Sequence, residues 1–168
     1  MKRYSILLLT VLFFSCENKD QTTKISEEQM AEDSVVVENA VPVYNPESKL
    51  YVWRATADYK KVKNEAAPIS TLNTDSLIKG LNEYYENVYI EKVKQGGDTL
   101  YTAIKESNYL TQQMGTTGAE VYLADLVLNL TSVPGVKYVN LDIKAGDHMQ
   151  PGTWSQESFK NYKEVIQK

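Results

Sequence analysis

The chain has 168 residues, of which 42% are hydrophobic and 10% aromatic, and its formal net charge is −4. Residues 1–16 contribute +2 and residues 17–48 contribute −6, so residues 49–168 are neutral as a group. A neutral domain lacks the basic face that nucleic acids require, which excludes nucleic acid as an expected partner. About 120 residues are enough for one domain with its own hydrophobic core.

The N-terminus has the architecture of a lipoprotein signal peptide. Lys2 and Arg3 precede a short apolar run, residues 6–14, and Cys16 stands where that run stops. The run is shorter than the roughly 20 apolar residues that span a bilayer. Residues 13–16, FFSC, resemble a bacterial lipobox. The sequence therefore predicts that residues 1–16 end at a lipidated Cys16 (a palmitate-type acyl anchor), which holds the protein on a cell-envelope membrane, either in the periplasm or exposed at the surface.

Residues 17–48 are predicted to form an acidic tether. They contain eight acidic residues against two basic ones, and few large apolar residues beyond Val35 to Val37. Such a segment cannot bury enough surface to offset the entropy lost on ordering. Two interpretations stay open: a solvated spacer that holds the domain away from the membrane, and an acidic tail that docks on a basic partner.

The domain, residues 49–168, opens with a predicted strand over residues 50–55, whose aromatic face is expected to be half covered. Residues 58–68 are predicted to be a loop. A helix is predicted from Asn73 to about Glu86, capped by Asn73 or Thr74. Its apolar face is formed by Leu77, Ile78, Leu81, Tyr84 and Tyr85.

A β-hairpin is predicted next, with strands over residues 88–94 and 99–104 joined around Gly96-Gly97-Asp98. Residues 105–115 are polar and lead to a second helix. A capping box of Thr117 and Glu120 predicts where that helix begins.

The stretch from Thr117 to Ile143 predicts a helix, a tight turn and a strand. The helix runs to about Leu130 and is apolar except for a narrow strip of Tyr122, Asp125 and Asn129, which indicates burial on more than one side. Pro134-Gly135 favours a type II turn. Alternation of apolar and polar residues then predicts a strand over residues 136–143 with one covered face.

These residues resemble the closing helix, turn and strand of the GerMN domain, the sporulation and spore-germination module. Residues 128–131 (LNLT) and 134–136 (PGV) stand at the matching positions, and residues 144–148 (KAGDH) depart from the family's usual exit turn. The resemblance covers about a quarter of the mature chain. It implies a non-catalytic envelope assembly module, related in shape to ring-building domains.

The element order predicts an α+β domain of the βαββαβ type. Two helices on one face of a four-stranded, mostly antiparallel sheet form the ferredoxin-like arrangement, which ring-building motifs share. Ser155 is predicted to cap an additional C-terminal helix that runs to about Ile166 and turns Phe159, Tyr162, Val165 and Ile166 inward.

The sequence predicts no enzyme, cofactor or metal site. His148 is the only histidine and Cys16 the only cysteine, whereas a transition-metal site needs three or four ligands. Asp147 and His148 have the residue types of a general base and the carboxylate that orients it. Residues adjacent in sequence, however, seldom hydrogen-bond in the geometry of a catalytic triad. Ser155 and Ser158 have no partner that would select either as a nucleophile.

Aromatic residues are the candidates for binding, because the chain has 12 tyrosines and two tryptophans. Exposed Tyr and Trp side chains anchor protein interfaces or stack on sugars. The residues selected as interaction candidates are Trp53, Tyr122, His148 and Trp154. The favoured function is a membrane-anchored envelope lipoprotein that binds an envelope protein or a second copy of itself. The alternative is an envelope glycan-binding module that uses exposed Trp and Tyr, and a hydrolase ranks third.

Overall fold

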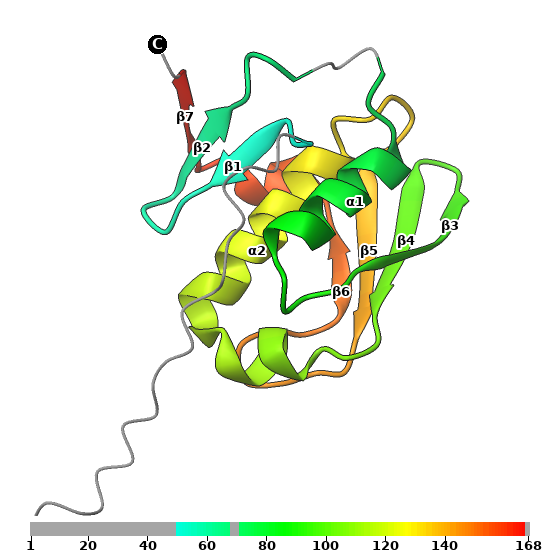
Figure 1. The fold of residues 1–168 in the computed structure, drawn as a ribbon, viewed down its shortest axis with the longest axis vertical. Helices are drawn as coiled ribbons and strands as arrows, with labels where there is room; N and C mark the ends of the chain where they lie inside the picture. The colour runs from blue at the N-terminus through cyan, green and yellow to red at the C-terminus, as the bar shows by residue number, and fades with distance from the viewer. Residues whose placement is uncertain (1–49, 68–70, 167–168) are drawn as a thin grey trace, which may run out of the picture. The chain divides into compact units, whose positions relative to one another are not determined.

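The computed structural model describes residues 50–67 and 71–166. They form an α+β fold with two α-helices and two mixed sheets (Figure 1). The strands are β1 (Trp53–Ala55), β2 (Lys60–Lys63), β3 (Glu91–Gly96), β4 (Thr99–Ile104), β5 (Tyr138–Ile143), β6 (Gly152–Trp154) and β7 (Lys163–Ile166). The helices are α1 (Thr74–Tyr84) and α2 (Gly115–Leu130), with a π-helix at Tyr109–Gln113 and a 3-10 helix at Gln156–Phe159. The predicted signal peptide, Cys16 and the tether lie outside the described residues.

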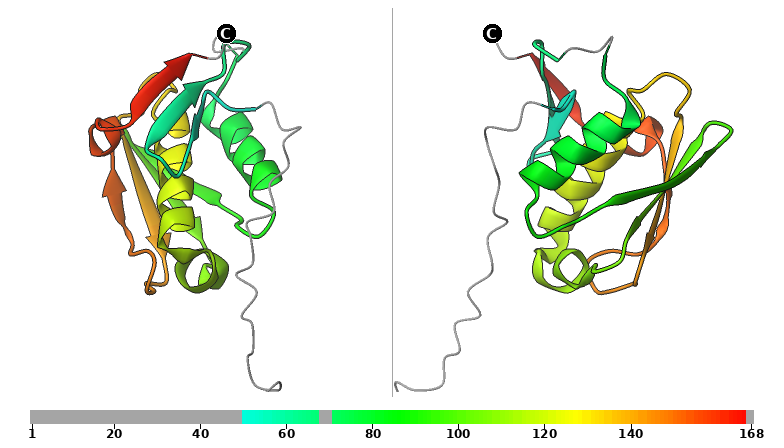
Figure 2. Two further views of the ribbon diagram at one scale, coloured as in Figure 1. Left: turned by 90° about the vertical axis from the view of Figure 1, so that its left-hand side faces the viewer. Right: turned by 45° about the vertical axis from the view of Figure 1, so that its right-hand side comes forward.

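The four-stranded sheet has the order β3-β4-β5-β6, and α1 and α2 lie side by side on its inner face (Figure 2). Strands β4 and β5 are parallel because α2 crosses over between them, and the other two pairings are antiparallel. The side chains that point to the helices are buried: Leu100, Thr102 and Ile104 from β4, and Val139, Leu141 and Ile143 from β5. The predicted alternation of the strand after Pro134-Gly135 is thereby confirmed.

The first helix begins where its capping residue predicts. Asn73 Oδ1 accepts from the backbone N–H of Ser76 at 2.9 Å, and Ser76 Oγ accepts from the N–H of Asn73 at 3.0 Å. Gly80 faces the incoming chain, since a Cβ at this position would lie 2.2 Å from the carbonyl oxygen of Leu50. The glycine thus lets the segment before β1 lie directly against α1, rather than bringing the helix close to a sheet.

Both predicted turns are confirmed. Gly97, in the two-residue connection between β3 and β4, has φ +62°. At the end of α2, Val136 N–H donates to the carbonyl of Val133 at 3.1 Å and Gly135 has φ +86°. A positive φ at this third turn position is the type II geometry that glycine permits.

The ferredoxin-like arrangement is wrong in its sheet topology. β1 does not join the four-stranded sheet; it pairs with β2, which forms where a loop was predicted, and β2 pairs in parallel with β7. This three-stranded sheet packs on the side of α2 that faces away from the four-stranded sheet (Figure 2). The fourth strand of the larger sheet is instead β6, which follows β5.

The C-terminal helix is also wrong. After Ser155 the chain makes one 3-10 turn and then the strand β7. The buried ring of Phe159 packs edge-on against Tyr162 at 5.5 Å, and the N–H of Lys163 donates to the carbonyl of Tyr59 at 2.9 Å. Val165 is β-branched, which favours a strand, and β7 completes the three-stranded sheet by pairing with β2.

The start of α2 differs from the predicted capping box as well. The helix begins at Gly115, directly after the π-helix, with Met114 in the N-cap position. Thr117 therefore lies inside the first turn and cannot act as its cap. No helix within residues 50–67 and 71–166 combines the length and apolar character needed to cross a membrane.

Candidate functional site

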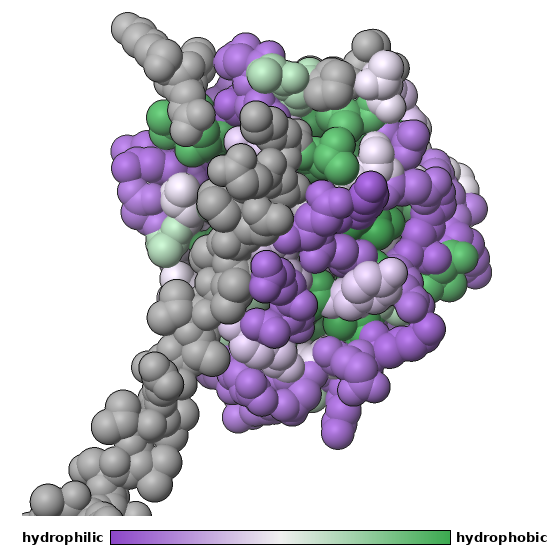
Figure 3. Space-filling view, viewed as in Figure 1, coloured by the Kyte–Doolittle hydropathy of each residue, from purple (hydrophilic) through white to green (hydrophobic). Residues whose placement is uncertain are grey.

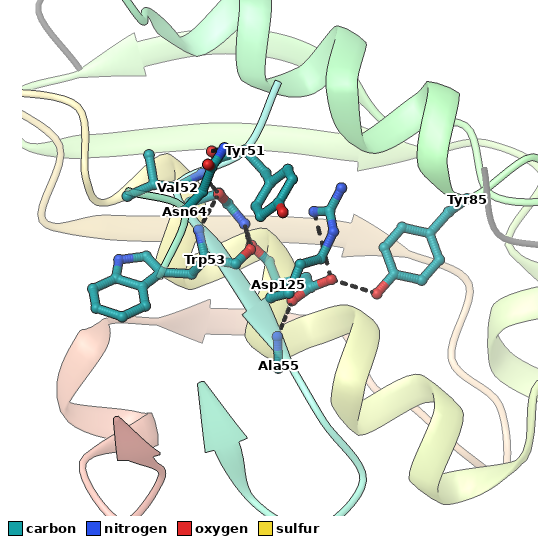
Figure 4. A network of polar contacts seen from close by, with 9 residues as sticks. Tyr51, Val52, Trp53, Ala55, Asn64, Tyr85 and Asp125 are labelled. Atoms are coloured by element: carbon teal, nitrogen blue, oxygen red, sulfur yellow. Dashed lines mark hydrogen bonds and ion pairs between the residues drawn. The ribbon is translucent and has the colours of Figure 1, made fainter. Parts of the chain in front are cut away.

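The polar strip of α2 is buried, and it holds β1 in place (Figure 4). Tyr122, Asp125 and Asn129 all have at most 1% of their surface exposed. Asn129 Oδ1 accepts from the N–H groups of Val52 at 2.6 Å and Trp53 at 3.0 Å, and its Nδ2 donates to the carbonyl of Trp53 at 2.8 Å. One amide side chain thus supplies the hydrogen bonds that a neighbouring strand would otherwise make.

Asp125, one helical turn before Asn129 in α2, also binds β1. Its Oδ1 accepts from the N–H of Ala55 at 2.5 Å, its Oδ2 accepts from the hydroxyl of Tyr85 at 2.7 Å, and Arg54 Nη1 lies 3.8 Å from Oδ2. Burial raises the pKa of Asp125 to about 6, although Arg54, Tyr85 and the Ala55 N–H favour the charged form.

Aromatic rings enclose the charged pair. The Arg54 guanidinium lies between two rings, with its central carbon 4.0 Å from the centre of Tyr51 and 3.7 Å from that of Tyr84. Tyr85 and Tyr122 pack edge to face at 4.9 Å. Asp125, Tyr85 and Tyr122 are buried, whereas Tyr51, Arg54 and Tyr84 are partly exposed. The network joins β1 to α2, so the second apolar side of α2 is covered by the chain itself and does not indicate a partner.

A groove lies at the surface between α1 and β3, with a volume of about 690 Å³. We call it the α1–β3 groove; it is lined by Asp75, Ile78, Lys79, Asn82, Glu83, Tyr89, Ile90, Glu91 and Lys92. Ile78 and Ile90 are buried beneath it, whereas Tyr89 is 66% exposed. Hydrophobic surface appears between charged residues over α1 and β3 in Figure 3.

The charged residues of the groove are paired along its walls. Lys92 Nζ lies 3.0 Å from Asp75 Oδ1, and Lys79 Nζ lies 3.7 Å from Glu83 Oε1. Asn82 spans the two walls, because its side chain both accepts from the N–H of Ile90 at 2.8 Å and donates to the carbonyl of Ile90 at 3.0 Å. The backbone N–H and carbonyl of Ile90 are therefore satisfied, and apolar side chains have the most to gain by binding there.

Strand β3 extends the exposed surface beyond the groove. Val93 is 60% exposed at an edge of the four-stranded sheet. The ladder with β4 shifts register between Lys92 and Lys94, which is the mark of a β-bulge. A bulge and lysines on an edge strand oppose sheet-to-sheet pairing between copies. This edge therefore favours binding through side chains over extension of the sheet.

The four interaction candidates do not form one surface. Trp53 lies in β1 and Trp154 in β6, so they belong to different sheets, and each is partly buried against the core. Tyr122 is fully buried, so its ring is not available at the surface. His148 is half-buried in the loop before β6, and its Nδ1 lies 3.1 Å from Thr116 Oγ1. The backbone N–H of His148 donates to the carbonyl of Thr111 at 3.0 Å.

The described residues contain no cluster of three or more His, Cys, Asp or Glu side chains that could hold a metal ion. Sequence reasoning assigned no role to Tyr89 and Val93. The signal was present in the hairpin, where Tyr89 and Val93 share one phase of the alternation in the predicted strand 88–94 and Val88 and Ile90 share the other. What was missing was the position of α1 beside β3, which makes Tyr89 part of a groove wall and leaves Val93 exposed just beyond it.

Comparison of the chain with protein-family models, with curated proteins and with solved structures finds no match.

Proposed function

We propose that the chain is an envelope lipoprotein, anchored through acylated Cys16, whose GerMN-like domain is not an enzyme and binds another protein at the α1–β3 groove. The observation that carries this proposal is the exposure of Tyr89 and Val93 beside a groove with buried isoleucines beneath it. Large apolar side chains exposed together mark interaction sites, and tyrosine is enriched at interface hot spots.

An extended polypeptide fits this groove better than a glycan does. Sugar stacking needs an open aromatic face with polar groups around it, whereas both tryptophans are partly buried. The groove offers the exposed ring of Tyr89 beside two buried isoleucines, and its charges are already paired. A partner segment with one or two apolar side chains would bury this surface without breaking the ion pairs.

Photo-crosslinking in the native envelope tests the proposal. A photoreactive amino acid replaces Val93 in the full-length lipidated protein, and a second protein carries it in place of Tyr138, which is 43% exposed on β5. We expect one recurrent protein adduct from position 93, and Tyr89→Ala in the same protein to remove it. Equal adducts from both positions, or an adduct that persists with Tyr89→Ala, would refute binding at the groove.

A further inference from the structure

The α1–β3 groove combines a projecting side chain and a recess on one patch of surface. Tyr89 projects at its wall, whereas Ile78 and Ile90 are buried beneath it. The volume of about 690 Å³ lies in the range of pockets that hold drug-sized ligands, so a tyrosine side chain fits within it. A two-fold interface between identical chains needs a patch that is complementary to itself. A ring beside a recess that can receive the same ring meets this requirement.

The backbone holds the Tyr89 ring in its exposed position. The neighbours of Tyr89 on both sides, Val88 and Ile90, are buried, and residues 88–90 belong to neither α1 nor β3. Asn82 binds both the N–H and the carbonyl of Ile90, and the N–H of Val88 donates to the carbonyl of Tyr85 at 3.0 Å. A large ring on a fixed backbone loses little entropy when it binds, which favours its use as an anchor.

Charged side chains of α1 are also complementary to themselves. Asp75, Lys79 and Glu83 are exposed, line the groove and follow one another at four-residue intervals, so they form a row with alternating charge along one side of the helix. A two-fold axis perpendicular to α1 sets this row antiparallel to its copy. With the axis between Lys79 and Glu83, Lys79 of each copy faces Glu83 of the other, and both contacts are attractive.

The charge row also excludes a neighbouring register. An axis that passes at Lys79 would bring the two copies of this lysine together and would place Asp75 opposite Glu83, so all three contacts would be repulsive. The other charged residues of the groove have partners within one copy: Lys92 Nζ lies 3.0 Å from Asp75 Oδ1, and Lys105 Nζ lies 2.7 Å from Glu91 Oε2. A second copy therefore meets a patch whose charges match its own in a defined register.

We propose that the protein bound at the α1–β3 groove is a second copy of this chain, in a two-fold dimer in which Tyr89 of each copy enters the groove of the other. This inference rests on the proposed function, because it names the occupant of the same groove. Tyr89 and Val93 contribute the apolar area. Lys79 and Glu83 set the register more than the strength, since exposed ion pairs contribute little. The β-bulge of β3 opposes a continuous sheet across the two copies.

Photo-crosslinking between two tagged copies tests the proposal. Two forms of the full-length lipidated protein with different epitope tags are produced in the same envelope, and one form carries the photoreactive amino acid at Val93 or, as the control, at Tyr138. We expect an adduct with both tags from position 93 and little from position 138. An adduct of position 93 with a different protein alone would overturn self-association and leave the proposed function standing, whereas no adduct specific to position 93 would overturn both.

Charge reversals at Lys79 and Glu83 test the register. Lys79→Glu in both copies, or Glu83→Lys in both copies, puts like charges at both contacts, and each is expected to lower the yield of the doubly tagged adduct about fivefold. One copy with Lys79→Glu and one with Glu83→Lys again place opposite charges at both contacts, so the yield should return to within about twofold of the wild-type value. Lys160→Glu, on the exposed 3-10 turn outside the groove, is the matched control and should leave the yield unchanged.

The mixed pair distinguishes self-association from an effect of each variant on its own fold. A yield from the mixed pair no higher than from either reversal in both copies would overturn the proposal, and so would reversals that leave the yield unchanged. A single chain with both Lys79→Glu and Glu83→Lys keeps the ion pair within α1 and the contacts between copies. This double variant is expected to crosslink like the wild-type protein, and a fivefold lower yield from it would also overturn the proposal.

Discussion

Asn129 tests most directly whether the polar strip of α2 stabilises the domain. Asn129→Ala removes the acceptor of the Val52 and Trp53 N–H groups and the donor to the Trp53 carbonyl. Val52 is buried, so its N–H loses its partner without gaining water. A buried unsatisfied donor costs about 1–3 kcal/mol, and the half-exposed groups of Trp53 cost less. We expect the free energy of unfolding to fall by about 2–4 kcal/mol in total.

Urea denaturation measures this change, and Asn140→Ala provides the matched control. Asn140 donates to Thr153 Oγ1 at 2.8 Å on the outer face of β5, where water can replace the bond. Its loss should cost less than about 1 kcal/mol. Hydrogen exchange of the Val52 and Trp53 amides should accelerate in Asn129→Ala. Equal costs for the two alanine variants, or unchanged exchange of the two amides, would refute the assignment of Asn129 as the partner of β1.

Three further predictions concern the core, the buried charge and the anchor. Replacing Asp125 with Asn should remove a pH dependence of the free energy of unfolding. The pKa of Asp125 is about 6 in the folded state against 3.8 when exposed. Its contribution to stability is therefore fully present below pH 4 and is lost as the pH rises through 6. Relative to Asp125→Asn, the wild-type protein should lose about 2 kcal/mol of unfolding free energy between pH 4 and 7, and equal pH profiles would contradict this. Leu126→Ala and Leu128→Ala should each cost about 2–5 kcal/mol in urea denaturation, because both side chains are buried, and a cost below about 1 kcal/mol would contradict that placement. Cys16→Ala should leave the precursor uncleaved and without acyl chains by mass spectrometry, and a mature protein that begins at another residue would contradict the signal-peptide interpretation.

The pH dependence and the loss of Asn129 test different parts of one contact. Asp125→Asn retains an acceptor for the Ala55 N–H but removes the charge that faces Arg54. Asn129→Ala keeps the charge and removes the backbone partner. Because the two residues lie one helical turn apart, their effects on stability are expected to be non-additive in the double variant.

Local structure was well determined by the sequence. The Asn73 cap, the Pro134-Gly135 turn and the alternation of β5 each depend on residues within a few positions of one another, and the structure confirms all three. The polar strip of α2 was also visible as a pattern. The role of this strip was not visible, because the backbone groups that Asp125 and Asn129 bind at β1 lie 70 to 77 residues earlier in the chain.

Pairing between distant segments was decided only by the tertiary structure. Residues 155–166 carry enough apolar side chains for the predicted helix face, yet residues 163–166 become β7 because β2, about 100 residues earlier, offers a free edge in parallel register. β1 leaves the larger sheet because side chains of α2 satisfy its backbone. The α1–β3 groove arises in the same way, because it joins residues of α1 to residues at the start of β3 that are distant in the local sequence pattern.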